Sequence, residues 1–292
     1  MGKTQLFLLT ALTMVAFAAN SLLTREALVT GDIDVASFGA LRLGAGAVVL
    51  VGLSLWLRRD MTLVSGKRAL SIIGLLAYIV GFTAAYVGMD AGLGALLLFG
   101  TVQVAMFAGA AVLREPLPGL RVAGALVALG GLIYLVWPWQ GIADSKYSVV
   151  MMVIAGVGWG LYSLVGRGSG NALGDTAVNF AAAALLFPLV IWALMGVPES
   201  VITARGATLA VISGAVTSGL GYALWYSILP RLGASVGAVA QLTVPPIAML
   251  GGVLMLGETL STKAILATII ILGGVAVSII GPSYFTKRSK AS

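Results

Sequence analysis

The sequence contains neither cysteine nor histidine. Without cysteine no disulfide can form, and without either residue there is no Ser–His or Cys–His dyad and no histidine-based zinc motif such as HExxH. The sequence also has no Walker-type glycine loop, so nothing in it indicates nucleotide hydrolysis. We therefore predict that the protein is not an enzyme and that it uses no metal and no other cofactor.

Charge is scarce as well: 9% of the residues are charged, 60% are hydrophobic, and the mean hydropathy is +1.07. Long uncharged runs are transmembrane helix candidates, and their continuity favours helices over the alternating pattern of a barrel. We expect an all-α integral membrane protein with ten transmembrane helices embedded in the lipid bilayer. The expected spans are Leu6–Thr24, Val35–Leu57, Ala69–Met89, Ala91–Leu113, Val122–Trp137, Tyr147–Gly166, Thr176–Met195, Ala207–Leu229, Ala234–Leu256 and Ala264–Pro282.

The second half of the chain repeats the first at a spacing of 142–143 residues. Aligned pairs include Ser21 with Ser163, Arg25 with Arg167, Met106 with Met249, Glu115 with Glu258, and Gly130-Gly131 with Gly273-Gly274. Each copy has five expected spans, an odd number, so the second copy must enter the membrane upside down. Inverted repeats around a midplane site are the architecture of alternating-access transporters. We assign residues 1–140 to the first repeat, 147–285 to the second and 286–292 to a basic tail.

Positive charge is distributed unevenly between the two sides of this arrangement. If both termini share a side, that side holds Lys3, Arg58, Arg59, Lys67, Arg68, Arg114, Arg121, Arg167, Arg231, Lys287, Arg288 and Lys290. The other side holds only Arg25, Lys146, Arg205 and Lys263. The positive-inside rule then predicts that both termini are cytoplasmic. The net charge of +7 therefore indicates topology rather than nucleic-acid binding.

Each repeat carries an apolar fourth helix, then Glu-x-Leu, then a fifth helix with Gly-Gly. The matching residues are Arg114-Glu115-Pro116-Leu117 with Gly130-Gly131, and Gly257-Glu258-Thr259-Leu260 with Gly273-Gly274. Over nearly the whole chain this pattern resembles the drug/metabolite transporter (DMT) superfamily, EamA type, and the chain is similar to bacterial aromatic amino acid exporters of the YddG group. The resemblance implies a multi-pass protein of the bacterial inner membrane that exports amino acids. It also implies a central cavity lined by helices 1, 3, 4, 6, 8 and 9, with helices 5 and 10 peripheral.

Polar and aromatic residues recur in the helices that the resemblance assigns to the cavity. In the first span, Thr10, Thr13, Asn20 and Thr24 fall on one helical stripe, which should face protein or water rather than lipid. The residues expected to bind substrate are Asn20, Tyr78, Phe82, Gln103, Trp159, Tyr162, Ser163, Tyr222 and Gln241. An aromatic wall with a few amides suits a flat, weakly charged solute. The alternatives are interfacial belts for the aromatic residues and bonds to neighbouring helices for the glutamines.

Two further features invite a functional interpretation. Arg42 is the one clear charge inside a span, where insertion costs at least about 2.5–3.5 kcal/mol. It is either a charge partner for an anionic or zwitterionic substrate or a structural arginine that reaches outward, and its position eight residues after Asp34 favours the second. Pro245 and Pro246 fall within the ninth expected span, where they act as a gating hinge or as a fixed kink.

The sequence thus favours an alternating-access exporter of aromatic and neutral amino acids and related metabolites, with no nucleic-acid partner and a monomeric state. The alternatives are a channel-like facilitator, a lipid or nucleotide-sugar translocator of the same superfamily, and, least favoured, an intramembrane enzyme. No acidic residue lies well inside a span, so we expect transport down the substrate gradient without obligatory proton exchange. Glu26 and Asp90, at span boundaries, are the remaining candidates for a proton relay.

Overall fold

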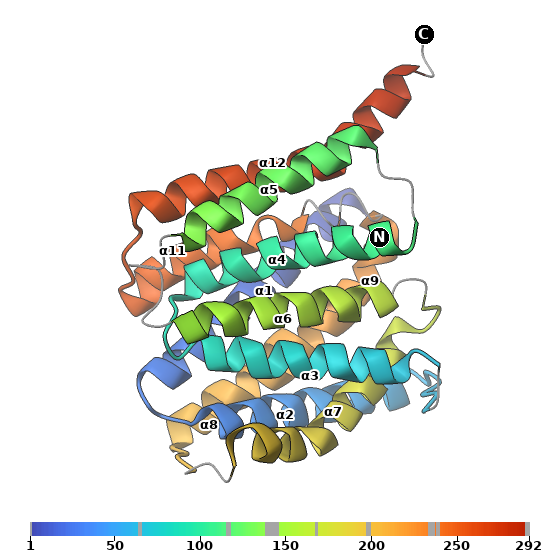
Figure 1. Ribbon diagram of the computed structural model, residues 1–292. Helices are drawn as coiled ribbons and strands as arrows, with labels where there is room; N and C mark the ends of the chain where they lie inside the picture. The colour runs from blue at the N-terminus through green and yellow to red at the C-terminus, as the bar shows by residue number, and fades with distance from the viewer. Residues whose placement is uncertain are drawn as a thin grey trace.

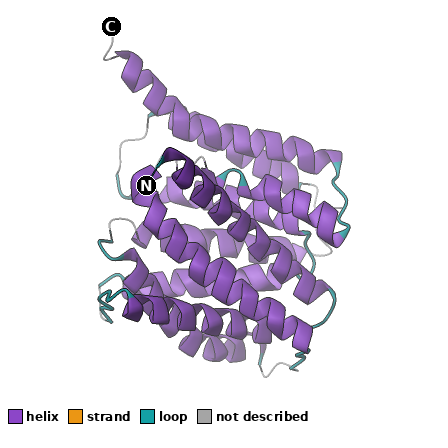
Figure 2. Ribbon diagram, turned by 180° about the vertical axis from the view of Figure 1, so that it is seen from behind, coloured by secondary structure: helices purple, strands orange, loops and turns teal. Residues whose placement is uncertain are grey.

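The computed structural model describes residues 2–63, 66–114, 118–137, 146–166, 169–196, 200–232, 237 and 240–289, and the regular elements within these ranges are helices (Figures 1 and 2). The helices are α1 (Lys3–Val29), α2 (Val35–Trp56), α3 (Arg68–Ala85), α4 (Ala91–Val112), α5 (Gly119–Val136), α6 (Lys146–Gly166), α7 (Ala172–Met195), α8 (Ala204–Ile212), η1 (Ser213–Leu220), α9 (Gly221–Leu232), α11 (Val244–Leu256) and α12 (Thr262–Ser289). An isolated bridge pairs Ile33 with Ile202.

Eight helices in the described part of the chain are long and apolar enough to cross a membrane. The eighth runs without interruption from Ala204 to Leu232, through α8, η1 and α9. Val244–Leu256 and Thr262–Ser278 are shorter apolar helical segments. The start of α1 and the end of α12 lie at the same end of the bundle, which we call the terminal end (Figures 1 and 2). The chain is therefore an all-helical, multi-pass membrane protein, as the sequence predicts.

Helix starts are set by side chains that accept hydrogen bonds from backbone N–H groups in the first turn, which otherwise lack partners. Asp34 accepts from the amide of Ser37 at the start of α2, and Thr203 accepts from the amide of Gly206 at the start of α8. At the other end of α11, Gly257 adopts a φ of +67°, a left-handed conformation that glycine tolerates best. That turn places Glu258 back against the bundle.

Helices α3 and α6 cross with their backbones in contact. A Cβ atom at Gly158 would lie 2.7 Å from the carbonyl oxygen of Gly74 and 2.7 Å from the amide nitrogen of Tyr78. The same closeness holds from the other side, because a Cβ at Gly74 would lie 2.8 Å from the carbonyl oxygen of Gly158. Small residues permit this approach, which is the common way that transmembrane helices associate. The crossing fixes the positions of the aromatic residues on both helices.

We expect Gly158→Ala to lower the melting temperature of the purified protein by several degrees, because the added methyl group meets backbone atoms that cannot rotate away. Overpacking of this kind costs about 1–3 kcal/mol. Gly130→Ala is the matched control, since a Cβ at Gly130 meets nothing within 4 Å. Equal melting temperatures for the two variants would contradict the tight crossing.

Two helices depart from the sequence expectation. The eighth span contains a π-helical segment, Ser213–Leu220, which no hydrophobic pattern indicates. The ninth is not one continuous helix: residues 242–243 form a turn, and α11 starts at Val244. Pro245 and Pro246 therefore lie in the first turn of a helix, where the missing N–H groups cost little, and the expected position in the helix interior is wrong.

Candidate substrate-binding site

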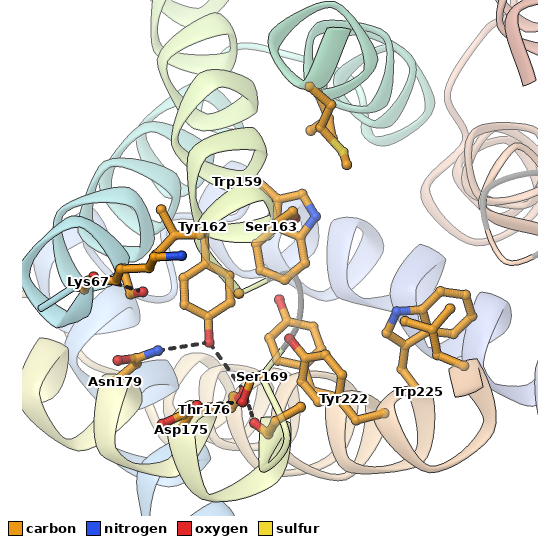
Figure 3. A pocket seen from close by; sticks show the side chains of 18 of the residues that line it. Lys67, Trp159, Tyr162, Ser163, Ser169, Asp175, Thr176, Asn179, Tyr222 and Trp225 are labelled. Carbon is orange, nitrogen blue, oxygen red and sulfur yellow. Dashed lines mark hydrogen bonds between the residues drawn. The ribbon is translucent and has the colours of Figure 1, made fainter. Parts of the chain in front are cut away.

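A cavity of about 450 Å³ lies between α3, α4, α6, α7 and α9 (Figure 3). It reaches the terminal end of the bundle, because its lining includes Arg68 at the start of α3, Gly166 at the end of α6 and Leu229 near the end of α9. We call it the vestibule. Its volume lies within the range of about 300–1,000 Å³ that is usual for small-molecule sites.

A second, much smaller chamber of about 30 Å³ lies deeper in the bundle. Its lining comes mainly from α1, α3, α4 and η1 and includes Phe17, Asn20, Tyr78, Phe82 and Thr217. Trp159, Tyr222 and Gln241 line both the deep chamber and the vestibule, so they form the boundary between the two. The vestibule can hold the body of a small solute, whereas the deep chamber has room for only one small group.

Aromatic rings in mutual contact form one wall of both chambers. The rings of Trp159 and Tyr162 stack at an interplanar angle of 22° with 5.4 Å between centroids. The Trp159 ring also lies 5.0 Å from that of Tyr78 and 5.1 Å from that of Tyr222. Tyr78 continues to Phe82, at a centroid distance of 5.2 Å. These contacts fix the ring orientations, so the wall is preformed.

Helix α7 supplies the polar side of the vestibule (Figure 3). The amide of Asn179 donates to the Tyr162 hydroxyl at 3.4 Å, and that hydroxyl lies 3.3 Å from the hydroxyl of Thr176. Asp175 forms an ion pair with Arg68, at 2.8 Å between Oδ1 and Nη2. Its other oxygen accepts a hydrogen bond from the Ser169 hydroxyl at 2.6 Å. The vestibule therefore has charged and polar groups beside its aromatic wall, joined to it through the Tyr162 hydroxyl.

Arg42 extends from α2 into the interior and is fully buried. Its Nη2 donates to the Tyr78 hydroxyl at 2.9 Å, and its Nε donates to the Ser218 hydroxyl at 3.3 Å. The guanidinium carbon lies 4.7 Å from the centroid of the Phe82 ring and 5.2 Å from that of Tyr78. The expectation that Arg42 reaches outward is wrong, because close packing of η1 on α2 directs the side chain toward α3.

The π-helical segment explains how hydroxyl groups gather at this depth. Ser213 and Thr217 both donate to the side-chain oxygen of Asn20, at 2.6 and 3.1 Å, and Ser218 receives the bond from Arg42. A wider helical turn changes which side chains face inward, and such segments often mark functional sites. Because both hydroxyls donate to one oxygen, the amide of Asn20 is fixed with its nitrogen toward Tyr78, at 3.4 Å from the hydroxyl.

The end of the bundle opposite the termini is held together by a partly buried ion-pair network of Arg25, Asp90 and Glu258, which we call the latch. Arg25 lies 3.7 Å from Asp90 and 3.8 Å from Glu258, and it donates to the backbone carbonyls of Tyr86 and Val87. Glu258 accepts from the amide of Ala91 at 2.7 Å. The latch thus joins the ends of α1, α3, α4 and α11.

More exposed contacts at the same end connect α1 and α8. Arg205 forms ion pairs with Glu26 and with Asp32. Hydrogen bonds from Thr30 and Thr203, together with the Arg205 charge, lower the pKa of Asp32. Partial burial opposes ionisation of Asp34, but hydrogen bonds from Ser37 and from the Val201 amide outweigh it and lower the pKa of that carboxyl. Both carboxylates therefore stay charged, and neither fits a group that gains and loses a proton near neutral pH.

Glu258 differs from these two carboxyls. Burial and the nearby charge of Asp90 raise its pKa above the ordinary 4.5, although the Ala91 amide and Arg25 act in the opposite direction. Exposure of Glu258 to water, as in an open latch, would return its pKa toward the ordinary value. The closed latch therefore binds a proton more readily than the open one, so acidification from neutral pH toward 4.5 stabilises the closed form.

We accordingly expect a cysteine placed at Ser21, in the deep chamber, to react more slowly with a membrane-impermeant thiol reagent from the latch side as the pH falls. Rates are divided by those of Ser200→Cys, an exposed position at the same end, to remove the pH dependence of the reagent. Glu258→Gln should abolish the effect. A relative rate that rises with acidity would contradict the assigned direction.

All nine residues predicted to bind substrate line these two chambers. The vestibule holds Gln103, Tyr162 and Ser163; the deep chamber holds Asn20, Tyr78 and Phe82; and the boundary holds Trp159, Tyr222 and Gln241. Their contact with substrate stays a prediction. The rest of the polar stripe on α1 has another explanation, because the hydroxyls of Thr10, Thr13 and Thr24 donate to backbone carbonyls one turn earlier.

Sequence reasoning missed the polar side of the vestibule and the latch. Asp175, Thr176 and Asn179 share one face at the start of α7, a helical spacing that could have been noticed. The signals for the latch were the boundary positions of Arg25 and Asp90 and the place of Glu258 in the repeated Glu-x-Leu motif. Glu115 and Arg167, the repeat partners of Glu258 and Arg25, lie outside the described residues.

Comparisons with known proteins agree with this architecture. The family model of the EamA-like transporter family matches residues 146–280. An uncharacterized protein of Pseudomonas aeruginosa is 44% identical over 270 residues, which cover 92% of this chain and 93% of that protein. A Salmonella typhimurium protein named "Probable amino-acid metabolite efflux pump" is 24% identical and covers 76% of this chain and 77% of its own.

An uncharacterized transporter of Archaeoglobus fulgidus is 23% identical over 72% of this chain and 75% of its own. A solved structure, described only as a crystal structure of a protein, aligns with a TM-score of 0.61 at 20% identity and covers 91% of this chain and 97% of that one. The structural likeness supports the fold alone, and the family match gives the class of protein. The chain belongs to the EamA-like transporter family of the drug/metabolite transporter superfamily.

Proposed function

We propose that this transporter exports aromatic and other neutral amino acids and related metabolites across the bacterial inner membrane by alternating access. The observation that carries the proposal is the asymmetry of the bundle: the vestibule reaches the terminal end, while the latch joins four helices at the other. The terminal end is cytoplasmic, in line with its excess of lysine and arginine. The structure then corresponds to the state that loads substrate from the cytoplasm.

In this proposal the transporter alternates between a state open to the cytoplasm and a state open to the other side. The alternation requires ten spans in two inverted repeats, residues 1–140 and residues 147–285. Helix packing supports this arrangement. Helix α2 packs against α7, α4 against α11 and α5 against α12, and each pair joins a helix to its own repeat partner. The α3–α6 crossing corresponds to the packing of α1 on α8, η1 and α9. This packing pattern is the one that a pseudo-twofold axis in the membrane plane would produce.

The lining supports the proposed substrate class. Stacked rings accept a flat apolar group, and the amides of Asn179, Gln103 and Gln241 offer neutral donors and acceptors. The name of the Salmonella relative is consistent with amino-acid efflux. A nucleotide-sugar translocator would need several deep cationic groups, and Arg42 alone is fully buried among the described lysine and arginine residues.

The turn that interrupts the helix before α11 is the proposed hinge. The turn at residues 242–243 separates Gln241, at the boundary of the chambers, from the latch-bearing end of α11. We expect replacement of Pro245 and Pro246 together by alanine to slow turnover several-fold with little change in apparent affinity, because a continuous helix could form through the turn. Loss of affinity at unchanged turnover would assign the prolines to site shape instead.

The test is uptake into proteoliposomes across a panel of aromatic, aliphatic and charged amino acids. We expect saturable uptake of aromatic and neutral members, faster when unlabelled substrate is present inside, and no accumulation from an imposed pH gradient alone. Nonsaturating flux without stimulation from the far side would indicate a channel-like facilitator. Concentrative uptake driven by the pH gradient, and lost in Asp90→Asn, Glu26→Gln or Glu258→Gln, would overturn downhill transport.

A further inference from the structure

The guanidinium of Arg42 is a fully buried charge without a counter-charge in the described part of the chain. None of the described carboxylates lies within 4 Å of it, and its Nη1 has no hydrogen-bond partner among the described residues. Its partners, Tyr78 and Ser218, are neutral hydroxyls. A buried cation that pairs only with hydroxyls and ring faces is costly to the fold, and buried charges are normally paired. An anion that enters the site would complete its coordination.

The position of Arg42 relative to the chambers supports such an anion. Tyr78 and Phe82, which Arg42 contacts, both line the deep chamber, and so do Asn20 and Thr217. The deep chamber is therefore the part of the cavity where a negative group would meet a positive field.

The π-helical segment makes this a built site rather than an accident of packing. A Cβ at Gly214 would meet the backbone of Arg42, so η1 lies directly against α2 at this point. One turn later Ser218 fixes Nε, which leaves the other edge of the guanidinium to Tyr78 and to an incoming group. A planar guanidinium with one free nitrogen suits a planar acceptor such as a carboxylate.

We propose that Arg42 binds the carboxylate of the transported molecule and so determines specificity for acids. This inference rests on the proposed function and deepens it. The apolar body of the solute occupies the vestibule against Trp159, and its carboxylate passes the boundary into the deep chamber, where it displaces the Tyr78 hydroxyl from Nη2. Solutes that lack the acid group leave Arg42 without a partner and bind weakly.

Calorimetric titration of the purified protein with a matched series tests the assignment. The series is phenylalanine and phenylacetate, which carry a carboxylate, against phenylalaninamide and phenethylamine, which do not. We expect the wild-type protein to bind each acid at least tenfold more tightly than the amide and the amine. We expect Arg42→Gln to bind each acid at least tenfold more weakly than the wild type does, while its affinity for the amide changes less than twofold. Arg42→Lys should retain part of the preference for the acids.

Arg59→Gln is the matched control, since Arg59 is an exposed arginine outside both chambers. Tyr78→Phe keeps the charge and removes the neutral hydroxyl, so it should retain at least a tenfold preference for the acids even if Arg42→Gln fails to fold. Removal of an uncompensated buried charge should also leave the melting temperature of Arg42→Met at or above that of the wild type.

An acid preference that survives in Arg42→Gln would overturn the inference, and so would the loss of that preference in Tyr78→Phe. The inference also fails if the wild-type protein binds acids and amides equally, or if it binds neither acid. The proposed function fails by a different result, namely acid-selective binding without any transport of amino acids in proteoliposomes. The two failures are therefore distinguishable.

Discussion

Replacement of Arg25 by glutamine is expected to increase the rate at which a cysteine at position 21 reacts from the latch side by ten- to a hundredfold. Arg25 is the centre of the latch, where it meets two carboxylates and two backbone carbonyls. Breaking a fully buried ion pair costs about 3–5 kcal/mol. The separations of 3.7 and 3.8 Å and the partial exposure of Asp90 reduce this to about 1.4–2.8 kcal/mol, which corresponds to the stated change in population.

Arg205→Gln is the matched control for this prediction. Arg205 also pairs with two acidic residues at the same end, but its side chain is 55% exposed. Exposed ion pairs contribute about 0–1 kcal/mol, so the labelling rate should change less than fivefold. Because the native sequence contains no cysteine, the introduced cysteine is the only thiol in the protein that the reagent can modify. Equal effects of the two substitutions would show that the latch has no special role in closing the cavity.

Trp159→Ala is expected to weaken binding of an aromatic amino acid at least tenfold and to affect leucine less. The Trp159 ring contacts Tyr78, Tyr162 and Tyr222 and lines both chambers, so its removal disorders the wall and takes away its central face. A single aromatic contact contributes about 0.5–1.5 kcal/mol beyond the area that it buries. Apparent affinity in a proteoliposome uptake assay measures the effect.

Trp192→Ala provides the comparison, because Trp192 is 64% exposed on the outer part of α7 and lines neither chamber. Its loss should leave uptake kinetics within twofold of the wild type. Trp159→Phe should recover most of the affinity, since a ring remains in place. If leucine and aromatic amino acids lose affinity equally in Trp159→Ala, the wall shapes the cavity but does not recognise rings.

Much of the fold could be predicted from hydropathy and the internal repeat, because a membrane span must be a long apolar run. The residues at which the helices begin and end were harder to predict. The sequence indicated one continuous ninth span, yet residues 242–243 form a turn before Pro245. Hydrophobicity does not distinguish a continuous helix from two collinear pieces, and only the prolines carried a local signal. The π-helical segment at Ser213–Leu220 is rich in glycine, serine and threonine, and this composition does not by itself specify a π-helix.

The candidate site could be predicted where aromatic and amide residues recur at helical spacing, as with Tyr78 and Phe82. It could not be predicted where tertiary packing decides. The sequence indicates that Arg42 lies inside a span but favours a side chain that reaches outward, whereas packing of η1 against α2 directs it inward. The latch likewise joins Arg25 to Glu258 across most of the chain, and no local pattern reveals such a partner.

Alternating access, the central claim, is tested most directly by the reactivity of two single cysteines, Ser163→Cys in the vestibule and Ser21→Cys in the deep chamber, in right-side-out and inside-out vesicles. Without substrate we predict that an impermeant thiol reagent modifies Ser163→Cys only from the terminal side and that Ser21→Cys is protected from the latch side. Under conditions of net export, Ser21→Cys should become reactive from the latch side while Ser163→Cys becomes protected from the terminal side. Simultaneous reactivity of one position from both sides, or reactivities that rise together, would contradict the account.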